Sequence, residues 1–388
     1  MPVKAASSLI ARKGSFQDAL LGWYHRNARD LPWRRSPSLY RTVVSEFMLQ
    51  QTRMSTVLPY FKRWMDALPG FAALAAAPED RVLKLWEGLG YYSRSRNLHR
   101  LAQALVALPE IPHSPEAWRL LPGVGPYTAA AITSISFGEP AACVDGNVVR
   151  ILTRLTADPA EYRDSATAAK ALTPLAADLV PATSPGDHNQ AMMELGATVC
   201  LRKKPLCLLC PVRTFCAAQR SNPESYPKIA SKTIERSSLV RAWCVRGESL
   251  LLHRADTSAR RLAGLHELPT AEQLGLASSA VLKRPLLAKR KRSITRFQIA
   301  ESVHAVGFEG SSRPGGRTGT GGLVWVPLRK IDSIALSGPH RRWVNEILAL
   351  QAAGRISFPS RRAADKRPGP SAEKVCPQRA FVRRDGTE

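Results

Sequence analysis

A glycine turn followed by an aspartate is the feature that most constrains what this chain can fold into. The stretch 121–147 begins Leu-Pro-Gly-Val-Gly-Pro-Tyr-Thr-Ala and ends Cys-Val-Asp-Gly-Asn. We expect Gly123 and Gly125 at positive φ, a conformation that costs glycine little. The alanine-rich segment after them predicts a helix, and Trp118 and Leu120 predict another helix before the turn. The sequence therefore predicts a helix, a hairpin and a second helix.

This hairpin is also a candidate contact for nucleic acid. Free N–H groups at the start of a helix favour a phosphate, because they lack partners and the helix dipole is positive there. Such a contact grips the backbone of a nucleic acid without reading its bases. A glycine turn between two core helices is the alternative, so Gly123 and Gly125 need support from elsewhere in the chain.

The charge of the chain gives that support. Its 388 residues carry a formal net charge of +25, and Lys and Arg outnumber Asp and Glu in both halves. A charge of this size favours a polyanionic partner such as DNA, with a solvated basic surface as the alternative. A chain of this length also predicts two domains with tails.

The sequence predicts no contact with membranes. It has no run of 18 apolar residues, and its first residues lack the apolar core of a secretory signal. We expect a monomeric, cytoplasmic protein associated with the nucleoid. In that reducing compartment its seven cysteines are expected to be ligands or free thiols instead of disulfides.

The hydrophobic pattern divides the chain into five segments. We expect a disordered leader at 1–14, a helical domain at 15–221, a linker at 222–235, a smaller α+β domain at 236–353 and a disordered basic tail at 354–388. Within the α+β domain the pattern predicts strands near 238–245, 249–253, 294–308 and 323–326, a loop at 311–322 and a closing helix at 341–350.

Four cysteines lie near the end of the helical domain. Cys200, Cys207, Cys210 and Cys216 are separated by six, two and five residues, so they can surround one metal centre. Zinc sites usually pair two Cys-x-x-Cys units, and only Cys207 and Cys210 have that spacing. The pattern resembles the loop of the endonuclease III and adenine glycosylase families, and the resemblance implies a [4Fe–4S] cluster. Zinc is the alternative.

A lone carboxylate lies in the otherwise apolar segment 41–52. Burial of Glu46 would raise its pKa, which suits a general acid, whereas an ordinary paired glutamate is the alternative. The sequence Ser-Glu-Phe-Met-Leu-Gln-Gln-Thr closely resembles the signature of the adenine DNA glycosylase family (MutY), within the helix-hairpin-helix superfamily. In that family the glutamate matching Glu46 protonates adenine and handles the water. The aspartate matching Asp145 stabilises the positive sugar.

This pairing is chemically sensible. Protonation of the leaving base weakens its N-glycosidic bond, and a carboxylate below the sugar offsets the oxocarbenium charge. The resemblance thus implies catalytic roles for Glu46 and Asp145.

Position 127 distinguishes two reaction classes. Relatives that also nick the strand carry a lysine two residues after the second hairpin glycine, because a Schiff base requires an amine. Here that residue is Tyr127, and no lysine occurs from 85 to 169. We therefore expect base excision without an efficient lyase step. The resemblance also implies that Tyr127 and Asn147 contact the reacting centre.

Reaching a base inside a duplex requires extruding it. By resemblance, Gln51 and Tyr91 are the residues that enter the DNA. The resemblance further implies that four residues line the adenine pocket: Leu31, Trp33, Arg34 and Gln190.

Residues 236–350 resemble the Nudix-like C-terminal domain of the same family, which recognises 8-oxoguanine. Two departures occur: His266 replaces a tryptophan, and Arg296 stands where histidine is common. Thr295 is the candidate for a hydrogen bond to the lesion. No cluster of adjacent glutamates is present to bind magnesium, so we expect no Nudix hydrolase activity.

Together these features predict a mainly α helix-hairpin-helix glycosylase domain with an iron–sulfur loop and a smaller α+β Nudix-like domain. The expected activity is monofunctional excision of adenine from DNA in which it is mispaired with 8-oxoguanine or guanine. Two alternatives stay open: a bifunctional glycosylase and lyase of the endonuclease III type, and a catalytically silent DNA-binding module.

Overall fold

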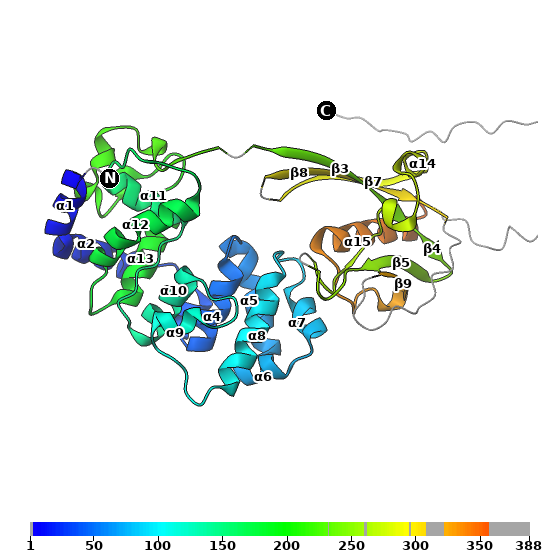
Figure 1. The fold of residues 1–388 in the computed structure, drawn as a ribbon, viewed down its shortest axis with the longest axis horizontal. Coiled ribbons are helices and arrows are strands. Elements are labelled where there is room, and N and C mark those ends of the chain that lie inside the picture. The colour runs from blue at the N-terminus through cyan, green and yellow to red at the C-terminus, as the bar shows by residue number, and fades with distance from the viewer. Residues whose placement is uncertain (1–2, 232, 260–261, 295, 308–321, 357–388) are drawn as a thin grey trace, which may run out of the picture.

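The computed structural model describes residues 3–231, 233–259, 262–294, 296–307 and 322–356. The chain forms a helical lobe and a smaller lobe of strands and helices, joined by one extended strand (Figure 1). Within the described residues, no helix has both the length and the apolar character that crossing a membrane requires.

The helical lobe has two groups of helices, each with its own core. One core is built mainly from α4 (Leu39–Leu49), α5 (Met54–Ala67), α6 (Phe71–Ala76), α7 (Glu79–Trp86), α8 (Ser93–Ala107), α9 (Pro115–Arg119) and α10 (Pro126–Phe137). The other is built mainly from α1 (Val3–Ala11), α2 (Lys13–Asn27), α11 (Gly146–Leu155), α12 (Ser165–Leu179) and α13 (Pro185–Thr198). The short α3 (Pro32–Arg35) leads from α2 toward α4. The prediction that this part of the chain is mainly α-helical is therefore confirmed.

The predicted disordered leader at 1–14 is wrong for most of its length. Residues Val3–Ala11 form α1, and Leu9 is buried in the second core. Basic and polar residues hid the apolar side of this short helix, which is held by packing against α11 and α12.

The hairpin between α9 and α10 has the predicted order. Gly123 has a φ of +74°, and a Cβ there would lie 2.3 Å from the Cβ of Asn97 in α8. Both the conformation and the close approach therefore require glycine. The expectation for Gly125 is wrong, since its φ is −89°. Gly125 instead caps α10, which begins at Pro126, a favoured first residue of a helix.

The chain after α13 runs through four short 3₁₀ turns: Cys207–Leu209, Arg213–Phe215, Ala217–Arg220 and Pro223–Ser225. The expected linker at 222–235 is partly attached to the helical lobe. Strand β2 (Lys228–Ile229) pairs in parallel with β1 (Glu161–Tyr162), and Arg154 donates a 2.7 Å hydrogen bond to the carbonyl of Pro223. The first part of the expected linker therefore belongs to the helical lobe.

The second lobe contains two small sheets. In one, β8 (Phe297–Ala305) lies between β3 (Glu235–Trp243), to which it is parallel, and β7 (Leu286–Ile294), to which it is antiparallel. The other contains β4 (Val245–Arg246), β5 (Ser249–Arg254), β6 (His266–Glu267) and β9 (Gly322–Pro327). A core between them includes side chains of the closing helix α15 (Gly338–Ala352), and the short helix α14 (Ser278–Leu282) contacts β3.

The sequence pattern missed β7, because Lys289–Arg292 interrupts its apolar character. The sheet accommodates these charges: Arg290 pairs with Glu346 of α15, and Arg292 pairs with the buried Glu301 of β8. The closing helix is longer than predicted at both ends. Most of the predicted glycine-rich loop at 311–322 and the tail beyond 356 lie outside the described residues.

Candidate active site

Glu46 lies in the middle of α4, with 7% of its surface exposed. All residues from Thr42 to Met48 are buried, so the Glu46 carboxyl group lies within a buried segment of the helix, away from solvent. Burial raises the pKa of Glu46 to about 7. A hydrogen bond from Tyr127 and the charge of Arg34 lower the pKa, whereas the charge of Asp145 raises it. Glu46 is thus poised to carry a proton near neutral pH.

Asp145 is held in a different way, at the first turn of α11. One of its oxygens accepts hydrogen bonds of 2.8 Å from the backbone N–H groups of Asn147 and Val148. The other accepts a 2.8 Å bond from the side-chain amide of Asn147. Asp145 is therefore the N-cap of the helix, and three donors fix the direction of its carboxylate.

Tyr127 lies near both carboxylates, whose charges act on its phenol. Its hydroxyl lies 2.9 Å from the sulfur of Met193 and hydrogen-bonds Glu46. Burial, followed by the charges of Glu46, Cys143 and Asp145, raises its pKa well above the usual range. The structure thus brings three predicted site residues, from α4, α10 and the start of α11, close enough for their charges to act on one another.

Sequence reasoning missed the residues that support this point. Asn189 of α13 accepts a bond from the backbone N–H of Cys143 and donates to Ser134 and to the carbonyl of Ala141. It thereby holds the segment before Asp145 against α10. Burial of Cys143 beside the carboxylates raises the pKa of its thiol. No local motif marked Asn189, since its contacts join distant segments of the chain.

The four predicted residues of the base pocket divide into two pairs. Arg34 donates 3.0 Å hydrogen bonds to Gln190 and to the buried Glu194, and its charge acts on Glu46. Leu31 is buried, and Trp33 packs edge-on against Phe61 with ring centroids 5.0 Å apart. The structure therefore brings Arg34 and Gln190 together near the carboxylate. Glu194, which the sequence did not single out, also binds Arg29.

Gln51 and Tyr91 share an unusual backbone conformation. Their φ angles are +55° and +46°, and both side chains are exposed. A residue other than glycine in this region costs about 1–3 kcal/mol, and such residues cluster at functional sites. Both predicted DNA-entering residues therefore lie in loops that the surrounding structure must hold in place.

One buried guanidinium holds both loops. Arg94 donates to the carbonyls of Phe47, Met48 and Gln50 over 2.6–3.0 Å. It also donates to the Thr52 hydroxyl and to two carbonyls of the other loop, those of Leu89 and Gly90, over 3.0–3.2 Å. Arg94 thus ties the loop of Gln51 to that of Tyr91. The sequence placed Arg94 beside Tyr91 but did not indicate this contact.

The four cysteines line one cavity beside α11. Arg154 donates a 3.2 Å hydrogen bond to the sulfur of Cys200 and so can balance thiolate charge. Among the described residues, no group of His, Cys, Asp and Glu is arranged to hold a single metal ion. Four sulfurs around a cavity are the donor set that iron–sulfur clusters use, so these residues fit a cluster.

A hydrogen-bonded path joins the cysteine loop to the carboxylates. Arg150 donates 2.8 Å to the carbonyl of Cys200 and 3.0 Å to the side-chain oxygen of Asn147, which in turn binds Asp145. Gly196 leaves space for the Asn147 side chain, because a Cβ atom at position 196 would lie 2.5 Å from the Cβ atom of Asn147. The cysteine loop therefore helps to position Asp145.

The predicted lesion contact, Thr295, lies outside the described residues. Its neighbour Arg296 forms a 2.9 Å ion pair with Glu235. The ring of His266, the other departure from the family pattern, lies 3.1 Å from the carbonyl of Ala335.

Several comparisons with known proteins agree on one family. Residues 44–176 match the HhH-GPD superfamily base excision DNA repair protein family. Relatives named adenine DNA glycosylase include proteins of Homo sapiens, 44% identical over 59% of this chain and 43% of their own length, and Mycolicibacterium smegmatis, 39% identical over 50% and 66%. The relative from Arabidopsis thaliana is 43% identical over 74% of this chain and 54% of its own length. The chain spans less than half the length of the human relative.

Two solved structures also match the chain. A thermostable thymine-DNA glycosylase is 28% identical, with a TM-score of 0.47 over 54% of this chain and 97% of its own. An endonuclease III–DNA complex is 20% identical, with a TM-score of 0.44 over 54% and 96%. The matched family segment contains Glu46, the hairpin and Asp145. Residues 44–176 of this chain therefore match the HhH-GPD superfamily of base excision DNA repair proteins, and the relatives that the chain resembles are named adenine DNA glycosylase.

Proposed function

We propose that this protein is a monofunctional adenine DNA glycosylase that removes adenine mispaired with 8-oxoguanine or guanine. The observation that carries the proposal is the convergence of Glu46, with a pKa of about 7, and the capped Asp145 on Tyr127. The names of the relatives support adenine as the base. The family model of repair by base excision supports DNA as the partner.

In this proposal Glu46 supplies the proton that the departing base needs. At a pKa of about 7 it is protonated in a large fraction of molecules at neutral pH. Transfer of the proton to a ring nitrogen of adenine weakens the N-glycosidic bond. The carboxylate left behind can then accept a proton from the attacking water.

Asp145 has the complementary task. As the base leaves, positive charge develops on the sugar, and a fixed carboxylate lowers the energy of that state. Because helix donors already hold Asp145, it need not reorganise during the reaction. Asn147 keeps the carboxylate in place, and Tyr127 contacts the reacting centre.

The same site disfavours a lyase reaction. A lyase needs an amine that can form a Schiff base with the sugar. The phenol of Tyr127 stands at the lysine position of the bifunctional relatives and has no amine with which to form a Schiff base.

Other residues would bind the substrate. We assign Gln51 and Tyr91 to the DNA gap and Leu31, Trp33, Arg34 and Gln190 to the adenine pocket. The N–H groups of the hairpin at Gly123 and Gly125 precede the twelve-residue helix α10 and suit a DNA phosphate.

Cys200, Cys207, Cys210 and Cys216 would hold a [4Fe–4S] cluster. When bound, the cluster would cross-link the 3₁₀ turns into one rigid loop. The path through Arg150 then connects this loop to Asn147 and Asp145. We expect that loss of the cluster would loosen Asp145.

The second lobe, residues 236–353, would act as a Nudix-like reader of 8-oxoguanine, with Thr295 as a contact. The match to the Arabidopsis thaliana relative covers 74% of the chain, more than residues 1–235 contain, which supports a shared second lobe.

An excision panel tests this proposal. Purified full-length protein is incubated in excess with duplexes containing A:8-oxoguanine, A:G, A:C and thymine glycol, and strand breaks are measured with and without hot alkali. We expect alkali-dependent cleavage at adenine opposite 8-oxoguanine and guanine. Excision of thymine glycol, or efficient borohydride trapping of the protein on DNA, would overturn the proposal in favour of a bifunctional enzyme.

A further inference from the structure

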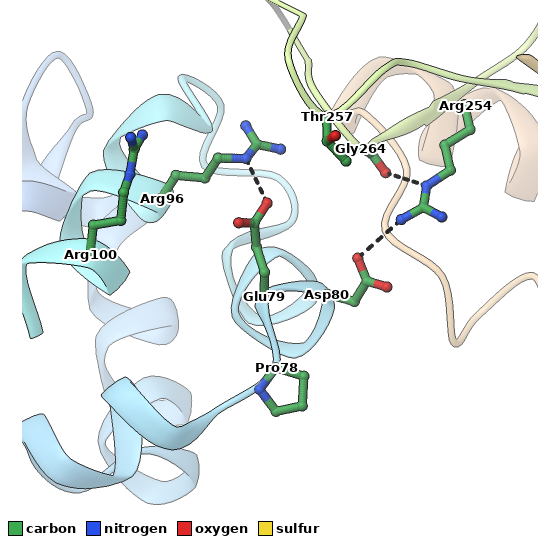
Figure 2. Close-up of a pocket in the computed structure, with 8 residues that line it drawn as sticks. All are labelled: Pro78, Glu79, Asp80, Arg96, Arg100, Arg254, Thr257 and Gly264. Atoms are coloured by element: carbon green, nitrogen blue, oxygen red, sulfur yellow. Dashed lines mark hydrogen bonds and ion pairs between the residues drawn. The ribbon is translucent and has the colours of Figure 1, made fainter. Parts of the chain in front are cut away.

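The second lobe grips α7 at both of its ends. At the start of α7, Arg254 of the second lobe lies 3.6 Å from Asp80. Arg96, which pairs with Glu79 over 2.8 Å, donates to the carbonyl of Ala263. Figure 2 shows the side chains of Glu79, Asp80, Arg96 and Arg254 around a pocket between the lobes. This end of the contact is charged and partly exposed.

The other end of α7 is held more tightly. The carboxylate of Glu87 accepts a 2.5 Å hydrogen bond from Arg341 of α15 and a 3.1 Å bond from the backbone N–H of Leu336. Only 9% of its side chain is exposed, as is 13% of that of Arg341. Partly buried pairs of this kind are worth more than exposed ones, because water screens them less.

Glu87 begins the loop that carries Tyr91, and a second contact lies at the end of this loop. The hydroxyl of Tyr92 donates 3.2 Å to the carbonyl of Leu336 and accepts 3.3 Å from the N–H of Gly88. Loop residues on both sides of Tyr91 are therefore bonded to the same short segment of the second lobe.

Apolar packing fixes this contact further. Leu265 and Ala335 of the second lobe are buried in the core of the first helix group, which also contains Trp86 and Leu89. The lobes therefore share a core beside the loop, and the contact is not merely a set of surface ion pairs.

From these contacts we infer that the second lobe braces the loop of Tyr91 and so controls its entry into DNA. The inference rests on the proposed function of Tyr91. Its backbone at φ +46° needs support, and Arg94 supplies that support from within the helical lobe. Glu87 and Tyr92 supply it from the second lobe. They are positioning residues, which act through Tyr91.

This brace gives the second lobe a task besides recognition of the lesion. The position of the second lobe on DNA is coupled to the loop of Tyr91, which extrudes the base, because the lobe and the loop pack against each other. A mismatch that the second lobe fits poorly would then be extruded poorly too.

The test measures extrusion with 2-aminopurine as the target base opposite 8-oxoguanine. Unstacking raises its fluorescence, so the signal requires no chemistry. We expect Glu87→Ala to lower both the extruded fraction and single-turnover adenine excision about tenfold, equal to about 1.4 kcal/mol. Asp332→Asn is the matched control, because Asp332 also pairs with Arg341. Its side chain is 89% exposed, and this ion pair does not involve the loop of Tyr91. This variant should behave as the wild type.

A double-mutant cycle separates a brace from general damage. If Glu87 acts through Tyr91, Glu87→Ala should have no further effect when Tyr91 is already alanine. Equal losses in both backgrounds, or a Glu87→Ala protein that matches the wild type, would overturn the inference. Should thermal unfolding show that Glu87→Ala is misfolded, Tyr92→Phe, which removes one hydroxyl, replaces it in the same cycle.

The outcome remains separable from the proposed function. A wild-type protein that excises no adenine contradicts the proposed function. A wild-type protein that excises adenine while the cycle is additive contradicts only the brace.

Discussion

The middle of α4 and the start of α11 present the same functional group in opposite surroundings. Glu46 is buried among apolar neighbours, which raises its pKa to about 7. Asp145 lies at a helix start, where three donors hold its carboxylate. The difference teaches how one fold supplies both an acid and a fixed anion: burial retains a proton, and a helix N-terminus favours negative charge.

The largest expected effect comes from removing the acid. Glu46→Gln keeps the size of the side chain but cannot transfer a proton, so we expect single-turnover excision to fall by roughly 10³–10⁴-fold, the upper range for general acid–base catalysis. Quenched-flow or manual single-turnover assays on A:8-oxoguanine duplexes measure it. Retention of ordinary rates would remove Glu46 from the reaction.

Removing the charge of Asp145 should have the next largest effect. Asp145→Asn can still cap α11, since asparagine is as good a cap, but it no longer offsets charge on the sugar. We expect a rate loss of roughly 10²–10³-fold, the size seen when one stabilising group is lost. Little change in the melting temperature should accompany it. A large drop in stability with a modest drop in rate would mean that Asp145 is structural.

The pH dependence of excision should report the protonation of Glu46. Above pH 7 the protonated fraction of Glu46 falls, so excision should fall about tenfold for each further pH unit.

The raised pKa of Glu46 also makes the stability of the protein depend on pH. Because folding favours the protonated form, the wild type should lose stability as the pH rises from about 4.5 to about 7. Glu46→Gln should lack this loss in denaturant titrations, and an identical pH profile in both proteins would contradict the assignment.

The smallest expected effect comes from changing Tyr127, which hydrogen-bonds Glu46. The Tyr127 hydroxyl lowers the pKa of Glu46 by hydrogen bonding its ionised form. Tyr127→Phe should therefore move the alkaline limb of the pH–rate profile upward, by about one pH unit or less. Since phenylalanine retains the packing, the rate at pH 6 should change little. A downward move of the limb would show that Tyr127 does not act on Glu46 in this way.

Much of the site could be predicted because its motifs are local. The Gly123 turn, the spacing of the four cysteines and the apolar segment around Glu46 each lie within a short stretch of the sequence. Local pattern failed where tertiary contacts decide. Residues of α1 pack against α2, α11 and α12, and arginines of the charged strand β7 pair with Glu301 and Glu346.

The sequence by itself determined which chemical groups are available: an acid within an apolar helix, an aspartate after the hairpin, no lysine at 127 and four cysteines in one loop. Only the tertiary structure decided how these groups meet. It brought Glu46 and Asp145 to Tyr127, tied two loops to Arg94, and set the second lobe against Glu87. The physical reason is that composition and short-range spacing fix the properties of a group, whereas burial, hydrogen-bond partners and local charge depend on residues far away in the chain.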